Sequence, residues 1–189
     1  MISIRRARPA DAIAIGAVHV AAWRSTYPGI LPDGFLSRLS VPRQAAHYDQ
    51  AIRDAMPVYV ATVSGQEALP GTTPRVVGFA TGGRGRGVSI GGRRLGEGEI
   101  ETLYVLDDFR DRGVGRRLMR ATALHLADAG CRSIFLWVLR DKPSRWFYQR
   151  LGGRAVAEAV TQVGGQSVIQ TAFVWDPIEK LLQASTQAS

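Results

Sequence analysis

The chain has 189 residues, of which 46% are hydrophobic, so it is long enough for one globular domain with a buried core. Its formal net charge of +8 favours an anionic partner such as a phosphorylated small molecule, a nucleic acid or a membrane surface. No stretch reaches the roughly 20 apolar residues of a membrane-spanning helix, and we expect neither a signal peptide nor a membrane partner. The single cysteine, Cys131, excludes a disulfide framework and predicts a cytoplasmic protein.

The N-terminal part of the chain is predicted to fold as one strand and three helices. Side chains alternate between apolar and polar over residues 2–7, which is typical of a strand. Pro9 and Asp11 start the first helix. Its mostly apolar face is expected along Ile13, Ala17, Val20, Ala21 and Arg24. A short helix over 35–39 follows, and Ser40 caps a longer one.

The remainder of the chain is predicted to be rich in strands. They are expected over 57–63, 75–82, 99–105, 133–139, 154–163 and 166–175. A helix ends at Gly130, and a short helix covers 143–153. One strand–helix–strand unit requires a parallel crossing, so we expect an α+β fold with a mixed, mostly antiparallel sheet flanked by helices. A single domain is predicted over 1–176, followed by a polar tail over 177–189.

The turn between the strand at 99–105 and the next helix is rich in glycine and arginine. A helix N-terminus presents unpaired backbone N–H groups, and Gly113 and Gly115 carry no side chain that would keep a ligand away from them. Formal positive charge comes from Arg110, Arg112, Arg116 and Arg117. The combination favours a pyrophosphate. A dinucleotide fingerprint would need glycine in place of Leu118, and the Gly-Lys-Ser/Thr of a Walker loop is absent from the sequence.

The pattern Arg110-x-x-Gly113-x-Gly115, after a strand ending in Leu-Tyr-Val, resembles motif A of the GNAT family of acetyl-CoA-dependent N-acetyltransferases. The sequence IRRARPADA resembles the first strand and helix start of that family, and DKPSRWFYQRLGG resembles its motif B. The resemblance covers residues 2–175. It implies a GNAT-like fold splayed around an acetyl-CoA site, no metal, and acetyl transfer to an amine by direct attack in a ternary complex.

The resemblance also implies roles for individual residues. The backbone at the end of the strand would pair with the pantetheine arm, and the turn would hold the pyrophosphate. The cofactor residues implied are Leu103, Tyr104, Val105, Arg110, Arg112, Gly113, Val114, Gly115 and Arg116. Tyr148 matches the tyrosine that can protonate the departing thiolate. Asp141 stands where motif B has asparagine, and its negative charge argues against a role in binding an anionic cofactor.

Two glutamates are candidates for the base that accepts the proton of the amine. Glu99 and Glu101 lie two residues apart on a strand, so both should point to one face. Burial and mutual repulsion could raise the pKa of one carboxyl toward neutrality. The distance from Glu99 to Arg110 resembles that of the glutamate base in the histone-acetylating branch of the family, so Glu99 is the first choice and Glu101 the second. A chain of waters, with both glutamates on a solvent-facing side, is the alternative.

The acceptor is expected to lie against the N-terminal helices, where Trp23, Tyr27 and Ile30 cluster, although these residues could equally be part of the core. The acceptor itself, a small-molecule or peptide amine, is not identified by the sequence. A homodimer is left open.

Three other functions compete with an acetyltransferase. The Gly-x-Ser-x-Gly pattern at 87–91 lacks the strand and the helix that a hydrolase elbow needs. The arginine–glycine stretch at 82–98 resembles RNA-binding segments, but a loop between two strands explains it better than a nucleic-acid partner does. A non-catalytic acyl-CoA-binding domain is the third alternative. The three histidines are scattered without metal-ligand spacing.

Overall fold

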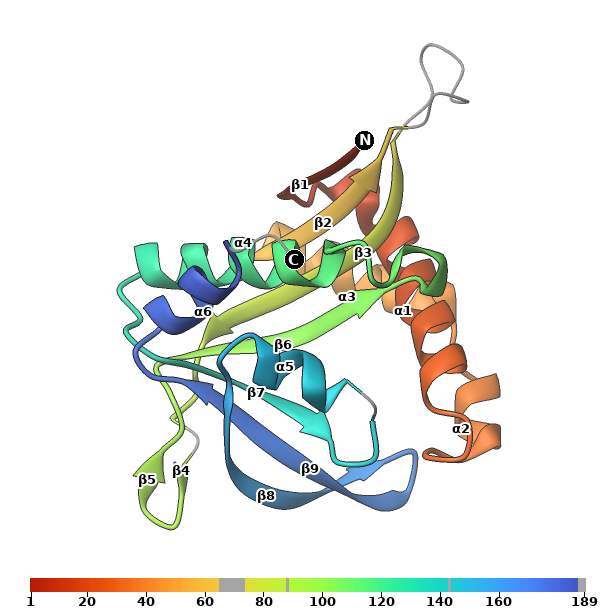
Figure 1. The fold of residues 1–189 in the computed structure, drawn as a ribbon. Helices are drawn as coiled ribbons and strands as arrows, with labels where there is room; N and C mark the ends of the chain where they lie inside the picture. The colour runs from red at the N-terminus through yellow and green to blue at the C-terminus, as the bar shows by residue number, and fades with distance from the viewer. Residues whose placement is uncertain (65–73, 88, 143, 187–189) are drawn as a thin grey trace.

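The computed structural model of the protein describes residues 1–64, 74–87, 89–142 and 144–186. The strands of the main sheet are β1 (Ile2–Arg6), β2 (Val58–Val63), β3 (Arg75–Arg84), β6 (Gly98–Val105), β7 (Ile134–Leu139), β8 (Arg154–Val163) and β9 (Gln166–Trp175). Within the described residues, the seven strands follow the order β1-β2-β3-β6-β7-β9-β8 (Figure 1). Neighbouring strands are antiparallel except β6 and β7, which run parallel. The predicted fold class and the single parallel crossing are therefore confirmed.

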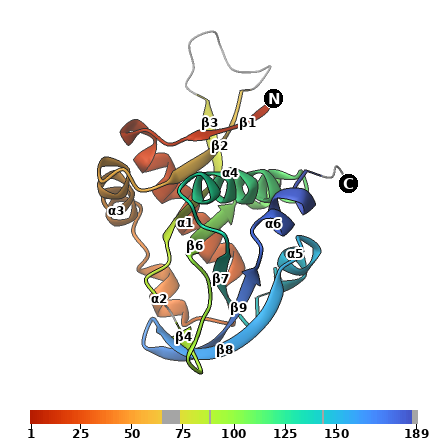
Figure 2. The same cartoon turned by 90° about the vertical axis from the view of Figure 1, so that its left-hand side faces the viewer.

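Helices cover both faces of the sheet. They are α1 (Ala12–Thr26), α2 (Asp33–Ser37), α3 (Val41–Arg53), α4 (Val114–Asp128), α5 (Arg145–Arg150) and α6 (Glu179–Ala184). On one face, α1 and α3 pack against β2 and β3 through Ile15, Tyr48 and Phe79. On the other face, α4 packs through Val114 and Leu118, and Figure 2 shows α4 crossing the sheet opposite α1 and α3. Alternating side chains of β2 and β3 serve the two cores.

The prediction of the apolar face of α1 is wrong. Ile13 is 72% exposed, and Ala17, Ala21 and Arg24 also face solvent, although Val20 is buried. The face that contacts the sheet carries Ala12, Ile15, Val18, His19 and Ala22. The helix is apolar almost all the way round, so periodicity alone could not identify the side that the sheet covers.

The C-terminal segment also differs from the expected polar tail. Ile178 and Leu181 are buried against the core, and the segment forms α6. Arg120 Nη1 of α4 donates to the Leu182 carbonyl at 2.6 Å and to Thr186 Oγ1 at 2.7 Å. Buried apolar side chains and the hydrogen bonds from Arg120 therefore dock a segment that is polar on average.

The arginine–glycine stretch at 82–98 is partly ordered against the sheet. β3 extends to Arg84, and a small hairpin pairs β4 (Ser89–Ile90) with β5 (Arg93–Arg94). Leu95 is buried against Phe135. Val88 lies outside the described residues, as do residues 65–73 between the strands predicted over 57–63 and 75–82. The chain between β3 and β6 thus contains a short hairpin where only a loop was expected.

A wedge opens in the middle of the sheet. β6 and β7 pair only through Gly98 with Ile134 and Glu99 with Phe135, and they diverge beyond those positions (Figure 1). A bulge at Glu101 interrupts the pairing of β6 with β3, because Thr102 faces Thr81 while Ile100 faces Gly82. The sheet is therefore split toward the carboxyl ends of β6 and β7.

Candidate active site

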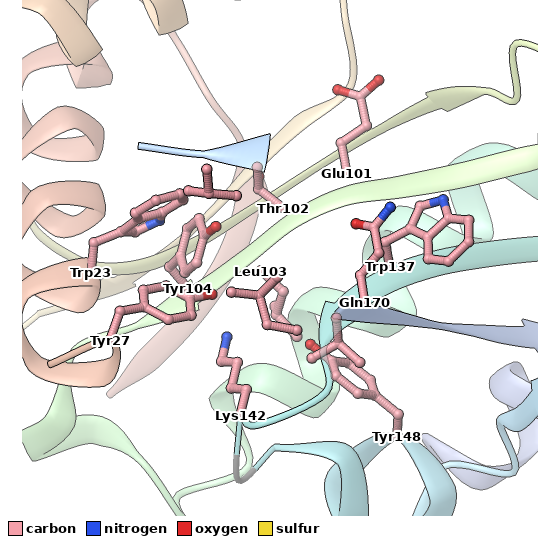
Figure 3. Close-up of a pocket in the computed structure, with 13 residues that line it drawn as sticks. Trp23, Tyr27, Glu101, Thr102, Leu103, Tyr104, Trp137, Lys142, Tyr148 and Gln170 are labelled. Carbon is pink, nitrogen blue, oxygen red and sulfur yellow. The ribbon is translucent and has the colours of Figure 1, made fainter. Parts of the chain in front are cut away.

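A cavity of about 190 Å³ lies in the wedge (Figure 3). It is bordered by α1, β6, β7, the loop after β7, α5 and the β8–β9 hairpin. The lining residues are Trp23, Tyr27, Glu101, Thr102, Leu103, Tyr104, Trp137, Val138, Leu139, Lys142, Tyr148, Val163 and Gln170. Ligands commonly bind at the carboxyl ends of diverging strands. The cavity thus combines residues that are far apart in the sequence.

The turn before α4 presents backbone N–H groups. Gly113 adopts a left-handed conformation (φ 70°) and provides no side-chain cap for the helix. The first intrahelical bond is donated by the amide of Arg117 to the Gly113 carbonyl at 3.1 Å. The amides that precede it in α4 therefore have no helical partner, and together with the helix dipole they fit an anion such as a pyrophosphate.

The arginines of the turn have different surroundings. Arg110 pairs with Asp107 at 2.8 Å and donates to Thr26 Oγ1 at 3.0 Å, which ties the turn to the end of α1. Arg112 is exposed and stacks over Phe109 at 5.3 Å. Arg116 lies in the first turn of α4. The positive charge of these arginines is partly offset by Asp107, Asp108 and Asp111 in the same segment.

Val114 and Gly115 serve the packing as well as the turn. The Val114 side chain is buried in the core under β3, so it can contact a ligand only through its backbone. A Cβ on residue 115 would lie 3.3 Å from the Phe147 ring. The glycine at 115 therefore permits close approach of α5, a constraint that the turn pattern does not reveal.

The end of β6 has a free edge toward β7. Beyond Glu99 no pairing joins β6 to β7 in the described chain, whereas β3 pairs with β6 as far as Val105. Leu103 and Tyr104 line the cavity on this edge. An extended polar arm could pair there as an additional strand, so this edge fits a pantetheine chain.

Tyr148 brings a hydroxyl into the cavity. It lies on α5, is 5% exposed, and packs against Phe147 and Phe173. Burial, followed by the nearby Tyr104, raises the pKa of Tyr148 well above its usual range. The hydroxyl therefore stays protonated at neutral pH, and burial also makes it a weaker acid than an exposed tyrosine.

The two candidate bases lie at different depths. Glu101, on the bulge, lines the cavity and is exposed, whereas Glu99 is partly buried and does not line it. Burial, and then the charge of Glu101, raise the pKa of Glu99 above its ordinary value. The charge of Glu101 thus acts on Glu99, and Glu101 is the one that borders the cavity.

Of the three residues predicted to bind the acceptor, two line the cavity and one does not. Trp23 and Tyr27 line the cavity, with ring centroids 5.0 Å apart. Ile30 does not line it, and packs instead in an apolar cluster with Leu31 and Leu36. The end of α1 therefore supplies two aromatic walls, while Ile30 supports them from behind.

Several lining residues were not predicted, and Lys142 is the most distinctive. It is partly buried, and burial, followed by the charge of Arg110, lowers its pKa to about 8. Asp141 is exposed and pairs with Arg140 at 3.8 Å. One signal for Lys142 was present in the sequence, because the chain has only two lysines beside 22 arginines. Trp137 and Gln170 carried no such signal.

Other potential reactive groups lie away from this cavity. Cys131 is buried, and burial raises the pKa of its thiol, which disfavours the nucleophilic thiolate. In the described part of the chain, no group of three or more His, Cys, Asp or Glu side chains could hold a metal ion. None of its helices is long and apolar enough to cross a membrane.

A split sheet, a free strand edge and a glycine turn at a helix N-terminus define an acetyltransferase of the acetyl-CoA-dependent class. The model of the acetyltransferase (GNAT) family matches residues 21–153, and the chain belongs to this family. It is 30% identical over 181 residues to the uncharacterized N-acetyltransferase YuaI of Bacillus subtilis (strain 168), with 96% of each chain covered. Acetyl-CoA is the acetyl donor that the family uses.

Solved structures share the fold at lower sequence identity. An N-acetyltransferase from Staphylococcus aureus Mu50 superimposes with a TM-score of 0.65 and 18% identity, covering 93% of this chain and 98% of its own. The yncA structure from Salmonella typhimurium, which contains its cofactor acetyl-CoA, gives a TM-score of 0.63 and 19% identity, covering 93% of each chain. The resemblance to the GNAT family noted in the sequence is thereby confirmed.

Proposed function

We propose that this N-acetyltransferase transfers the acetyl group of acetyl-CoA to a primary amine by direct attack, with both substrates bound together. The observation that carries the proposal is the cavity shared by Tyr148 and Glu101, at the free edge of β6. A proton donor and a proton acceptor there could serve the leaving thiol and the attacking amine. No acyl-enzyme is needed, and the buried Cys131 has no role in the reaction.

Acetyl-CoA would be held mainly by backbone groups. The edge of Leu103, Tyr104 and Val105 would pair with the pantetheine arm. The amides from Arg112 to Arg116, with the positive charge of Arg110, would hold the pyrophosphate. Support comes from the left-handed Gly113, which leaves the start of α4 without a side-chain cap.

The amine must lose a proton before or during its attack. We propose Glu101 as the group that receives it, directly or through a water, because Glu101 borders the cavity. Glu99 is the second candidate. The sequence ranks Glu99 first and Glu101 second, so this proposal inverts that order. The pKa of Glu99 is raised above its ordinary value, mainly by burial, which would favour Glu99 as a proton acceptor if the amine or a water reached it.

Tyr148 would protonate the departing thiolate. Its hydroxyl is in the cavity, and its pKa is raised mainly by burial, so the proton is present at neutral pH. Trp23 and Tyr27 would form the apolar wall against which the acceptor lies.

We place the reaction in the cytoplasm, because the lone cysteine is unsuited to a disulfide-bonded protein.

A panel of amines, amino acids, polyamines, aminoglycosides and peptides tests the proposal, with release of free coenzyme A as the readout. Release that depends on one class of amine, together with acetylated product of matching mass, is the expected result. Thermal stabilisation by acetyl-CoA without release for any amine would favour a non-catalytic acyl-CoA-binding domain. Stabilisation by RNA alone would favour the nucleic-acid alternative.

A further inference from the structure

Lys142 places an ammonium group beside aromatic rings in the cavity. It lies in the loop between β7 and α5, and Figure 3 shows its nitrogen pointing toward Tyr27 and Tyr104. Nζ is 5.5 Å from the centroid of each of these two rings. Aromatic faces attract a cation, but they supply no formal negative charge. The two rings therefore position the ammonium without neutralising it.

The charge of Lys142 has no acidic partner in the described residues. None of their ion pairs within 4.0 Å includes Nζ. Asp141, the adjacent carboxylate, pairs with Arg140 instead. The charged group that acts on Lys142 is Arg110, which is also positive. Because a partly buried cation requires an opposite charge, this end of the cavity favours an anion from outside the chain.

A second donor of the cavity is also unsatisfied. The indole Nε1 of Trp23 is buried and has no hydrogen-bond partner among the described residues. Buried N–H groups nearly always have an acceptor in folded proteins. The indole N–H and the ammonium both line the cavity. The Tyr104 hydroxyl lies beside the indole, but it makes no hydrogen bond to Nε1 by distance and angle.

The cavity is polarised. Figure 3 shows Glu101 on the far side of Thr102 and Leu103 from Lys142. From Glu101 to Tyr104, three residues along β6, the backbone rises roughly 10 Å. The Glu101 carboxylate points away from the other labelled side chains in Figure 3, so a negative charge borders the far end of the cavity and the positive charge of Lys142 lies at the other end. A substrate with a cationic and an anionic end would meet a complementary charge at each end.

We propose that Lys142 and the Trp23 N–H form an anion subsite for the acceptor, so that the amine substrate also carries a carboxylate or a phosphate. The inference rests on the proposed acetyl transfer and narrows its substrate class. The volume of about 190 Å³ is smaller than the roughly 300–1,000 Å³ of typical ligand sites, which favours a small molecule.

Matched pairs of amines test the subsite. γ-Aminobutyrate is compared with butylamine, and phosphoethanolamine with ethanolamine, by kcat/KM for coenzyme A release. The wild-type protein should prefer the anionic member of at least one pair by about tenfold or more, and the preferred pair distinguishes carboxylate from phosphate. Lys142→Met should remove most of that preference, and Lys142→Arg should retain part of it. Lys180→Met, which alters the exposed second lysine, should leave the ratio and both rates unchanged.

Binding is measured in parallel by calorimetric titration of the same pairs into each folded variant in the presence of coenzyme A. An equal response to both members of each pair, or a preference that survives in Lys142→Met, would overturn the subsite. The subsite would also be overturned if Lys142→Met bound coenzyme A more weakly but kept the preference for the anionic amine. An acetyl group found on Lys142 by peptide mass would overturn it as well. If no amine releases coenzyme A, the proposed function fails, and the calorimetric preference still decides the subsite.

Discussion

The turn before α4 and the cavity beside it are built in different ways. The turn is a contiguous segment whose binding groups are backbone amides, exposed by Gly113. The cavity draws its walls from α1, β6, β7, α5 and the β8–β9 hairpin, and its polar groups are side chains. A backbone site of this kind can be recognised from a short sequence pattern. A side-chain site exists only after the sheet has split and distant elements have met.

The largest effect is expected in the cavity. Tyr148→Phe retains the ring packing against Phe147 and Phe173 and removes only the hydroxyl. Turnover should fall by roughly 10² or more, as is usual for a general acid, while thermal stability and acetyl-CoA affinity stay nearly unchanged. The measurement is steady-state turnover beside calorimetric acetyl-CoA affinity. Tyr59→Phe, a change on β2 outside the cavity, is the control. Full activity of Tyr148→Phe would remove the tyrosine from the mechanism.

The glutamates should produce the next largest effect. Glu101→Gln retains shape but cannot accept a proton, so turnover should fall by roughly 10². The loss should be greatest at low pH, because free amine is scarcest there. Turnover against pH is compared with Glu99→Gln and with the exposed Glu179→Gln as control. If only Glu99→Gln is impaired, the order expected from sequence is restored, and if neither is, water carries the proton.

The ion pair between Arg5 and Asp11 lies outside the site, at the start of α1. It bears on the comparison of turn and cavity because α1 supplies one wall of the cavity. Arg5 donates two hydrogen bonds to Asp11 at 2.8 and 2.9 Å, and Asp11 also accepts from the amide of Arg8 at 2.7 Å. The hydrogen bond from Arg5 is the main cause that lowers the pKa of Asp11. The ion pair therefore stabilises the fold fully above the pKa that Asp11 has in the unfolded state. This stabilisation is lost as pH falls through the lower pKa that Asp11 has in the folded state.

Asp11→Asn should lower the free energy of unfolding at neutral pH by about 2 kcal/mol. The difference should begin to shrink as pH falls below the ordinary pKa of an aspartate, about 4, and should vanish only at lower pH, where the folded carboxyl is also protonated. Urea unfolding at several pH values provides the measurement. Asp49→Asn breaks the exposed Arg53–Asp49 pair and should have little effect at any pH. A pH-independent loss in Asp11→Asn would show that packing, and not charge, makes Asp11 important.

The smallest effect is expected in the turn. Gly113→Val places a side chain near the free amides, so acetyl-CoA affinity should fall about tenfold, or 1.4 kcal/mol. Because Gly113 has φ 70°, valine also strains the backbone there. Gly92→Val is the control, because Gly92 has φ 77° and valine there imposes a similar backbone strain away from the site. A Cβ on residue 92 would have no neighbouring heavy atom within 4 Å. Calorimetry should detect weaker binding only in Gly113→Val. Equal affinities in the two variants would contradict a role of the turn in binding phosphate.

The sequence predicted the strands, their order of appearance and the parallel crossing, because alternation and long apolar runs are local properties. Local pattern also identified the glycine turn. It could not identify the buried face of α1, since apolar residues surround that helix, or the docking of Ile178 and Leu181, which depends on a core made elsewhere. Trp137, Gln170 and Lys142 come together only through the divergence of β6 and β7. The role of each glutamate stays a prediction.

The use of arginine at 22 of the 24 basic positions leaves Lys142 and Lys180 as the only side-chain amines of the chain. One lines the cavity, and the other is exposed on α6. Reductive methylation with an isotope label would therefore give an NMR spectrum with two lysine signals and that of the N-terminus. The Lys142 signal would report directly on whatever enters the cavity, and the Lys180 signal would serve as an internal reference within the same molecule.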